Sequence, residues 1–192
     1  MSHFYDASFA WEYAIEHLDG RPDFLPMSHL YCARQFDVDD WVTKGMEQIL
    51  CGSLLQLNAT DVLLLGPATM LLIYQTREKM NHHRHGCALV CPPVTHDIDS
   101  CIAIQRCESG WGRAWWGEYN RPGVASMLLQ PRVPMKAIVD GLDRLDAGLM
   151  THICKQLTVS KLQASVADGG KLRIEEEYIQ EAVMAFRGAR RY

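Results

Sequence analysis

The sequence predicts an all-α protein: an irregular multi-helix bundle of about eight to ten short helices that includes a long loop rich in Cys, His and Pro. Three observations support this class. Apolar residues recur at helical spacing, capping residues and Gly or Pro separate the periodic segments, and no segment sustains the alternation of apolar and polar residues that marks a strand. We divide the chain into residues 1–80, 81–99 and 100–192, of which the second region is the loop.

The first region contains a series of short helices. The apolar spacing predicts them at residues 7–18, 26–36, 39–52, 61–65 and 67–80. Gly66 is expected to end the fourth helix, and Pro67 to open the fifth. Residues 62–65 also suit a buried strand, but a cap at Asn58 or Thr60 favours a helix. In the fifth helix the residues expected to pack are Met70, Leu71, Ile73, Tyr74 and Met80.

Residues 81–99 show no helical period, which predicts a long loop. Its notable residues are His82, His83, His85, Cys87, Cys91, Pro92, Pro93 and His96. A helix is expected next, with a core face formed by Ile104, Cys107, Trp111 and Trp115. A further helix is expected at 135–145, followed by an apolar stripe at Leu149, Ile153 and Leu157. The last helix has a buried stripe at Ile174, Tyr178, Ile179, Ala182, Val183 and Phe186.

Composition and charge restrict the class of partner. The chain has 192 residues, 48% of them hydrophobic, and a formal net charge of −4. This length can bury a hydrophobic core without disulfides. A weakly negative charge does not attract nucleic acid or anionic lipid, and the apolar runs are too short to span a membrane. We therefore expect neither nucleic acid nor membrane as a partner.

The cysteines and the first residues indicate a compartment. Seven cysteines, an odd number spread along the chain, fit free thiols or a metal site better than a disulfide framework. Residues 1–6 lack the basic start and apolar run of a signal peptide. We therefore expect an intracellular protein of the cytoplasm or nucleus.

The best candidate for a metal site consists of Cys91, His96, Cys101 and Cys107, because thiolate and imidazole ligands suit a structural Zn²⁺ ion. Cys101 and Cys107 would lie about 120° apart on a continuous helix, so they can chelate one ion only if Cys101 precedes the helix. The alternative is that these cysteines are small buried hydrophobic residues and that no cofactor binds.

No motif predicts an enzyme. The chain has no Gly-x-Ser-x-Gly sequence, phosphate-binding glycine loop, dinucleotide fingerprint or His-Glu-x-x-His sequence, so no catalytic residue is predicted. A cysteine-dependent enzyme is left open, because a sequence does not show which Cys and His meet in space. Trp116 points about 100° away from Trp115, and we expect it at an interface or second packing surface.

Two stretches resemble a known family. The sequence from Phe24 to Val42, with Leu64-Leu65-Gly66 and residues 73–78, resembles the helical region that follows the BTB/POZ fold in fungal BTB-domain proteins. The Cys-x₃-Trp-x₃-Trp-Trp element at 107–116 resembles a downstream element of the same proteins. There a Cys-x₂-His-x₂-Cys run often comes first. Here Cys101 and Cys107 occupy its outer positions, and Ile104 stands in place of the histidine.

The resemblance implies a helical protein-interaction module. The chain has room only for the last helix of a BTB/POZ fold, near residues 9–18, so the resemblance implies a fragment or truncated paralogue that lacks the BTB core. Apolar surface that the missing domain would cover is then expected near the first helix. We predict a non-enzymatic module that binds another protein or itself, through Phe4, Phe9, Trp11, Tyr13 and Trp116. The alternative function is a small zinc-stabilised helical domain.

Overall fold

The structure is a computed structural model that describes residues 8–21, 23–54, 57–99, 101–118, 121–130, 133–167 and 174–189. Helices make up most of these residues, and the strands among them form one small hairpin, which confirms the all-α prediction. In chain order the elements are α1 (Ser8–Asp19), α2 (Pro26–Phe36), α3 (Asp39–Cys51), α4 (Ala59–Leu89), α5 (Ile104–Trp116), β1 (Gly117–Glu118), β2 (Arg121–Pro122), α6 (Val124–Leu128), α7 (Met135–Gly141), the 3₁₀ turn η2 (Leu142–Arg144), α8 (His152–Ala167) and α9 (Ile174–Ala189).

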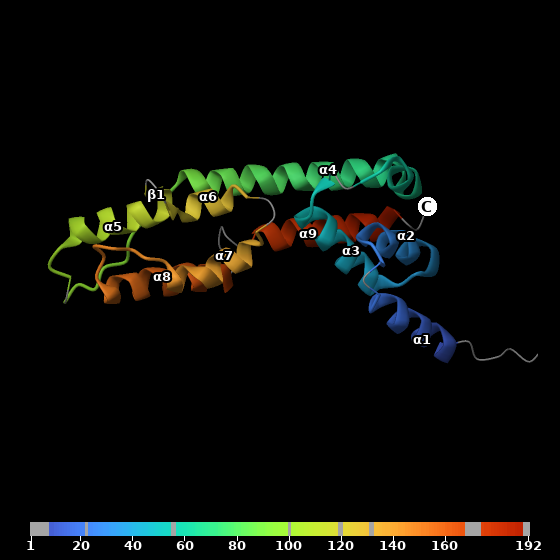
Figure 1. Ribbon diagram of the computed structural model, residues 1–192, viewed down its shortest axis with the longest axis horizontal. Helices are drawn as coiled ribbons and strands as arrows, with labels where there is room; N and C mark the ends of the chain where they lie inside the picture. The colour runs from blue at the N-terminus through green and yellow to red at the C-terminus, as the bar shows by residue number, and fades with distance from the viewer. Residues whose placement is uncertain are drawn as a thin grey trace, which may run out of the picture.

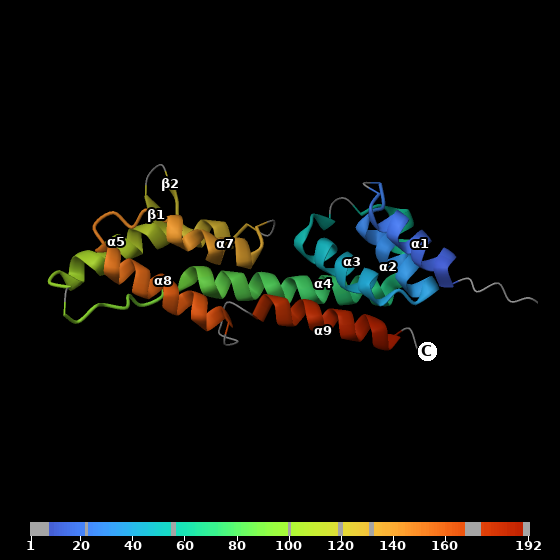
Figure 2. The ribbon, with the colours of Figure 1, turned by 90° about the horizontal axis from the view of Figure 1, so that it is seen from below.

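Helix α4 forms the spine of an elongated molecule (Figure 1). Helices α2 and α3 pack near its beginning, whereas α6 packs near its end and itself contacts α5. Helix α9 returns along α4 and also contacts α3 (Figure 2). Two ends of the molecule are therefore built around one long helix.

The start of α4 follows the predicted capping and break. The Asn58 side chain accepts hydrogen bonds from the backbone N–H groups of Thr60 and Asp61, and the Asp61 carboxylate accepts one from the Asn58 N–H. Gly66 then leaves the helical conformation at φ 78° and ψ 162°, a region that glycine adopts without the strain of a side chain. The break at Gly66 before Pro67 is confirmed.

The predicted loop at 81–99 is wrong in its first half, because α4 continues to Leu89. The buried face of this part of α4 is formed by Met80, Arg84 and Ala88, spaced four residues apart. A charged residue in the middle of a buried stripe hides the helical period from an apolar pattern. The connection between α4 and α5 is therefore residues 90–103.

The first hydrophobic core lies between α2, α3, the middle of α4 and α9. It contains large apolar side chains from all four helices, among them Leu30, Trp41, Met46, Ile73, Val183 and Phe186. Of the stripe predicted for the last helix, Ile179, Ala182, Val183 and Phe186 are buried and Tyr178 is half-buried. The side chain of Ile174 lies outside the described residues.

The second hydrophobic core joins the end of α4 to α5, α6, α7 and α8. Trp111 and Trp115 are buried in it, as their spacing predicts. Gly110 allows α5 to approach the 147–150 turn, because a Cβ atom there would lie 2.5 Å from the Ala147 carbonyl oxygen. This close approach brings the first turn of α5 toward α8.

A buried ion pair links the two cores. The Arg84 guanidinium on α4 donates from Nε to Glu175 Oε1 on α9 at 2.8 Å, and both side chains are almost fully buried. Arg84 also donates to the carbonyl oxygens of Gln130 and Val133, each at 2.8 Å. Glu175 accepts from the Met135 backbone N–H as well. The pair therefore fixes α9 and the start of α7 against α4.

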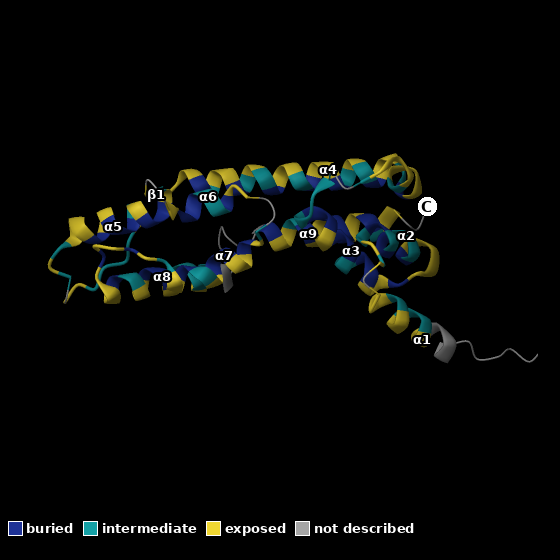
Figure 3. Ribbon diagram, in the orientation of Figure 1, coloured by how far each residue is buried: buried dark blue, intermediate teal, exposed yellow. Residues whose placement is uncertain are grey.

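Several apolar side chains that the sequence places on packed faces are exposed instead (Figure 3). Leu71 and Tyr74 lie on the outer side of α4, and Ile104 is exposed at the start of α5. The stripe of Leu149, Ile153 and Leu157 is also exposed, because α8 buries Cys154, Thr158 and Val159. In α4 and α8, apolar residues lie on two faces of the helix. Among the described residues, only one of these two faces packs against the rest of the molecule.

Candidate metal centre

Four potential metal ligands meet at the end of the molecule where α5 and α8 begin. They are His96 and Cys101 from the 90–103 connection, Cys107 from the first turn of α5, and Cys154 from the first turn of α8. Their ligand atoms all lie within 4.8 Å of one another. Elements far apart in the sequence therefore present one imidazole and three thiols to a common point.

Two of the six distances between ligand atoms are close to those around a tetrahedral zinc ion. Cys101 Sγ lies 3.5 Å from His96 Nδ1 and 3.6 Å from Cys107 Sγ. Zinc bonds of about 2.3 Å to sulfur and about 2.0–2.1 Å to nitrogen give tetrahedral edges of about 3.6 Å (S–N) and about 3.8 Å (S–S). Both distances differ from these edges by about 0.2 Å or less. The four ligand atoms lie within 4.8 Å of one another, so the group could hold a metal ion.

The backbone explains why Cys101 and Cys107 face the same point. Helix α5 begins at Ile104, so Cys101 precedes it, as chelation by both cysteines requires. The Cys101 N–H donates to the Asp97 carbonyl at 2.9 Å, and the Cys107 N–H donates to the Ala103 carbonyl at 3.2 Å. The first bond closes a tight turn, and the second starts the helix. Together they place the two sulfur atoms on the same side of the connection.

The connection is anchored to both helices that supply the other ligands. Trp111 Nε1 on α5 donates to the Pro92 carbonyl at 3.0 Å. On α8, Thr158 Oγ1 accepts from the Thr95 N–H at 2.9 Å and donates to the Cys154 carbonyl at 2.7 Å. His96 and Cys101 therefore do not depend on a metal alone for their position.

Two further side chains, Glu108 and Thr151, lie close to the candidate ligands. His96 directs Nδ1 toward the sulfur atoms, while its Nε2 lies 3.9 Å from the Glu108 carboxylate. A carboxylate that comes within hydrogen-bond distance of Nε2 would favour the tautomer that binds metal through Nδ1. The Thr151 hydroxyl lies 3.7 Å from Cys107 Sγ and caps the N–H of Cys154.

The thiols of the candidate centre differ in their pKa. Burial, reinforced by hydrogen bonding to Cys154, raises the pKa of the Cys101 thiol to about 11. Burial also raises the pKa of Cys154, but hydrogen bonds from the Thr151 hydroxyl and the Asp97 N–H outweigh it and lower the pKa to about 6. At neutral pH Cys154 is therefore more readily deprotonated than Cys101, and a metal ion that binds Cys101 must displace its proton.

The structure brings three of the four predicted ligands together and replaces the fourth. Cys91 does not belong to the group: its Sγ lies near the Pro92 carbonyl at 3.7 Å, and burial raises its pKa to about 11. Its place is taken by Cys154, which no spacing rule connects to the others. Another thiol of the predicted loop, Cys87, contacts His83 on α4 at 3.4 Å.

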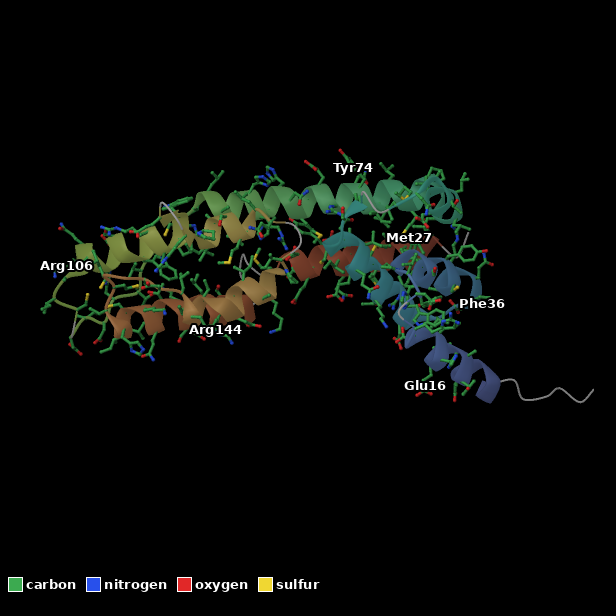
Figure 4. All side chains as sticks on the ribbon, in the orientation of Figure 1. Glu16, Met27, Phe36, Tyr74, Arg106 and Arg144 are labelled. Atoms are coloured by element: carbon green, nitrogen blue, oxygen red, sulfur yellow. The ribbon has the colours of Figure 1, made fainter. Side chains whose placement is uncertain are left out.

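The predicted interaction residues are only partly described. Phe4 lies outside the described residues, as do the side chains of Phe9 and Trp11. Tyr13 is 63% exposed and stacks on His17, and Trp116 is 51% exposed at the end of α5. The side chains of the described residues are drawn in Figure 4, where Glu16 marks α1 and Arg106 marks the end that holds the thiols.

A cavity of about 320 Å³ lies between α5, the β hairpin and the 145–149 turn. Arg113 and Arg121 line it, and each pairs with an acidic side chain of the same cavity, Glu118 and Asp146 respectively. It contains neither a cysteine nor a histidine.

Comparison with known protein families, with curated proteins and with solved structures gave no match. Among the residues that the structure describes, no helix has the length and apolar character needed to cross a lipid bilayer.

Proposed function

We propose that this chain is a zinc-stabilised helical domain in which His96, Cys101, Cys107 and Cys154 bind one structural Zn²⁺ ion. The observation that carries the proposal is the agreement of the 3.5 Å and 3.6 Å ligand contacts with the edges of a zinc tetrahedron. Sulfur-rich ligand sets select zinc over magnesium or calcium, which prefer oxygen. Four protein ligands leave no open position, which is typical of a structural site.

Zinc would add direct bonds between three segments that the second hydrophobic core already packs together. The 90–103 connection, α5 and α8 each supply at least one ligand. Because the unfolded chain does not present these ligands together, the free energy of metal binding adds to the stability of the folded state.

The test is the metal content of protein purified under reducing conditions, in the wild type and two cysteine variants. We expect one zinc ion per chain in the wild type and in Cys91→Ser, and loss of stoichiometric zinc in Cys154→Ser. Cys91 is the matched control, since it is a half-buried thiol of the same connection outside the group. Wild-type protein without zinc would overturn the proposal, and zinc lost from Cys91→Ser but kept in Cys154→Ser would overturn the ligand set.

A second candidate function is a non-enzymatic protein-interaction module. It is favoured by the exposure of Tyr13 and Trp116 and by the regular exposed stripe of Leu149, Ile153 and Leu157. The resemblance to the helical extension of fungal BTB proteins supports the same role. Seven free cysteines suit a reducing compartment, the cytoplasm or nucleus.

The simplest test of this function is whether the chain binds a second copy of itself. Sedimentation of the wild type at increasing concentration should reveal a dimer that Trp116→Ala or Ile153→Ser weakens. A photo-reactive side chain at position 116 should then crosslink two chains, whereas one at the exposed Arg144 should not. A monomer at all concentrations would exclude self-association and leave a different protein as the partner.

A further inference from the structure

One thiol of the metal centre is more accessible than the others. Cys107 and Cys154 are fully buried, whereas Cys101 is only half-buried. Its neighbours on the connection, Ile98 and Ile102, are 95% and 99% exposed. Cys101 is therefore the least buried of the three cysteines of the candidate centre.

The accessible thiol has a second thiol in contact. Cys107 Sγ lies 3.6 Å from Cys101 Sγ, and a disulfide requires about 2.05 Å. Cys101 lies on a connection outside the helices, held by one backbone hydrogen bond to Asp97, whereas Cys107 lies within α5. The sulfur atoms can therefore meet through movement of the connection while α5 stays in place.

We infer that Cys101 is a site of reversible oxidation by peroxides and that its disulfide with Cys107 releases the metal ion. This inference rests on the proposed zinc centre, because metal release is its readout. Loss of two ligands leaves only His96 and Cys154, too few for a closed structural zinc site.

The reaction balances with hydrogen peroxide as the oxidant. The Cys101 thiolate attacks one peroxide oxygen, the O–O bond breaks, and a sulfenic acid and hydroxide form. The Cys107 thiolate then attacks the Cys101 sulfur, so that the S–S bond forms and the S–O bond breaks with loss of a second hydroxide. Two protons from solvent convert the hydroxides to water. The two sulfurs are oxidised by two electrons in total, peroxide is reduced by two, and a dithiol reductant reverses the change.

The experiment uses the full-length, zinc-loaded protein. Its zinc content is measured first, and this step alone tests the proposed function. Hydrogen peroxide is then added in stoichiometric steps while a chromogenic chelator reports free zinc, and disulfides are mapped by mass spectrometry. We expect one zinc ion released per disulfide, a Cys101–Cys107 link, and recovery of zinc binding after reduction. Zinc that is retained, or a disulfide that joins other cysteines, would overturn the inference while the zinc proposal stands.

Two variants sharpen the result. Cys101→His keeps four zinc ligands but removes the accessible thiol, and we expect it to release zinc at least about tenfold more slowly under peroxide. Cys91→Ser, the matched control, should release zinc at the wild-type rate. Equal rates in Cys101→His and the wild type would contradict the role of Cys101. If Cys101→His does not bind zinc, the disulfide map of the wild type decides the question.

Discussion

The two hydrophobic cores are built from different side chains and helices. The first core is filled by large side chains such as Leu30, Trp41 and Phe186 from long, regular helices. The second contains two tryptophans but also four alanines and two cysteines, and α6 and α7 beside it have only 5 and 7 residues. Short elements bury little apolar area each, so the proposed zinc ion would add more to the second core than to the first.

The largest expected effect comes from removing zinc. A strong chelator under reducing conditions should expose the amides of α5 and α8 to hydrogen exchange by more than about a hundredfold, because these helices depend on the metal. The amides of α2 and α3 should remain protected. Cys154→Ser should give the same pattern without chelator. Equal loss of protection in both halves would mean that the cores do not differ as described.

The next largest effect is expected from breaking the Arg84–Glu175 ion pair, which links the two cores. Arg84→Ala leaves the buried Glu175 carboxylate without its cation, and we expect a loss of about 3–5 kcal/mol in the free energy of unfolding. Urea denaturation measures it, and both cores should be weakened. Lys79→Ala is the control, since its ion pair with Glu181 is exposed and long at 3.9 Å. Similar losses in the two variants would refute a special role for Arg84.

A smaller effect should be confined to the second core. Glu108→Gln removes the charge behind His96, and we expect zinc affinity to fall by about tenfold, as for other carboxylates that orient a metal-bound histidine. Competition with a chelator of known affinity measures the change. Glu118→Gln, which alters another exposed carboxylate beside α5, should leave the affinity unchanged. An equal change in both variants would indicate a general charge effect.

The smallest effect should be confined to the α4 cap beside the first core. Asn58→Ala removes the capping side chain of α4, and we expect a loss of about 1 kcal/mol in stability. Thermal unfolding followed by circular dichroism measures it. Zinc affinity should not change, because the cap lies far along α4 from the thiols. A parallel drop in zinc affinity would show that the cores are coupled more tightly than their contacts indicate.

Much of the helical order follows from local signals in the sequence. Asn58, Gly66 and Pro67 determine the start and break of α4 through their own hydrogen bonds and backbone preferences. The sequence near these residues is therefore enough to predict where α4 starts and breaks. The burial of Arg84 does not follow from such local signals. Its burial depends on Glu175, a partner from the far end of the chain, and the apolar pattern therefore ends the helix too early.

The metal centre was predictable only where its ligands are close in sequence. His96, Cys101 and Cys107 lie on one short connection and the helix turn after it, and spacing selects them. Cys154 joins them through the packing of α8 on this connection, a tertiary contact without a spacing rule. Cys91 also lies nearby in the sequence, but its sulfur packs toward Pro92. Proximity along the chain therefore predicts three members of the candidate group and not Cys154, which only the fold brings to them.

The most direct test of the zinc centre is the X-ray absorption spectrum of the purified protein at the zinc edge. We predict three sulfur neighbours at about 2.3 Å and one nitrogen neighbour at about 2.0–2.1 Å around one zinc ion per chain. The same measurement on Cys154→Ser should lose one sulfur neighbour or the metal itself. Oxygen neighbours, a different ratio of sulfur to nitrogen, or protein without zinc would contradict the assignment of His96, Cys101, Cys107 and Cys154 as the ligands.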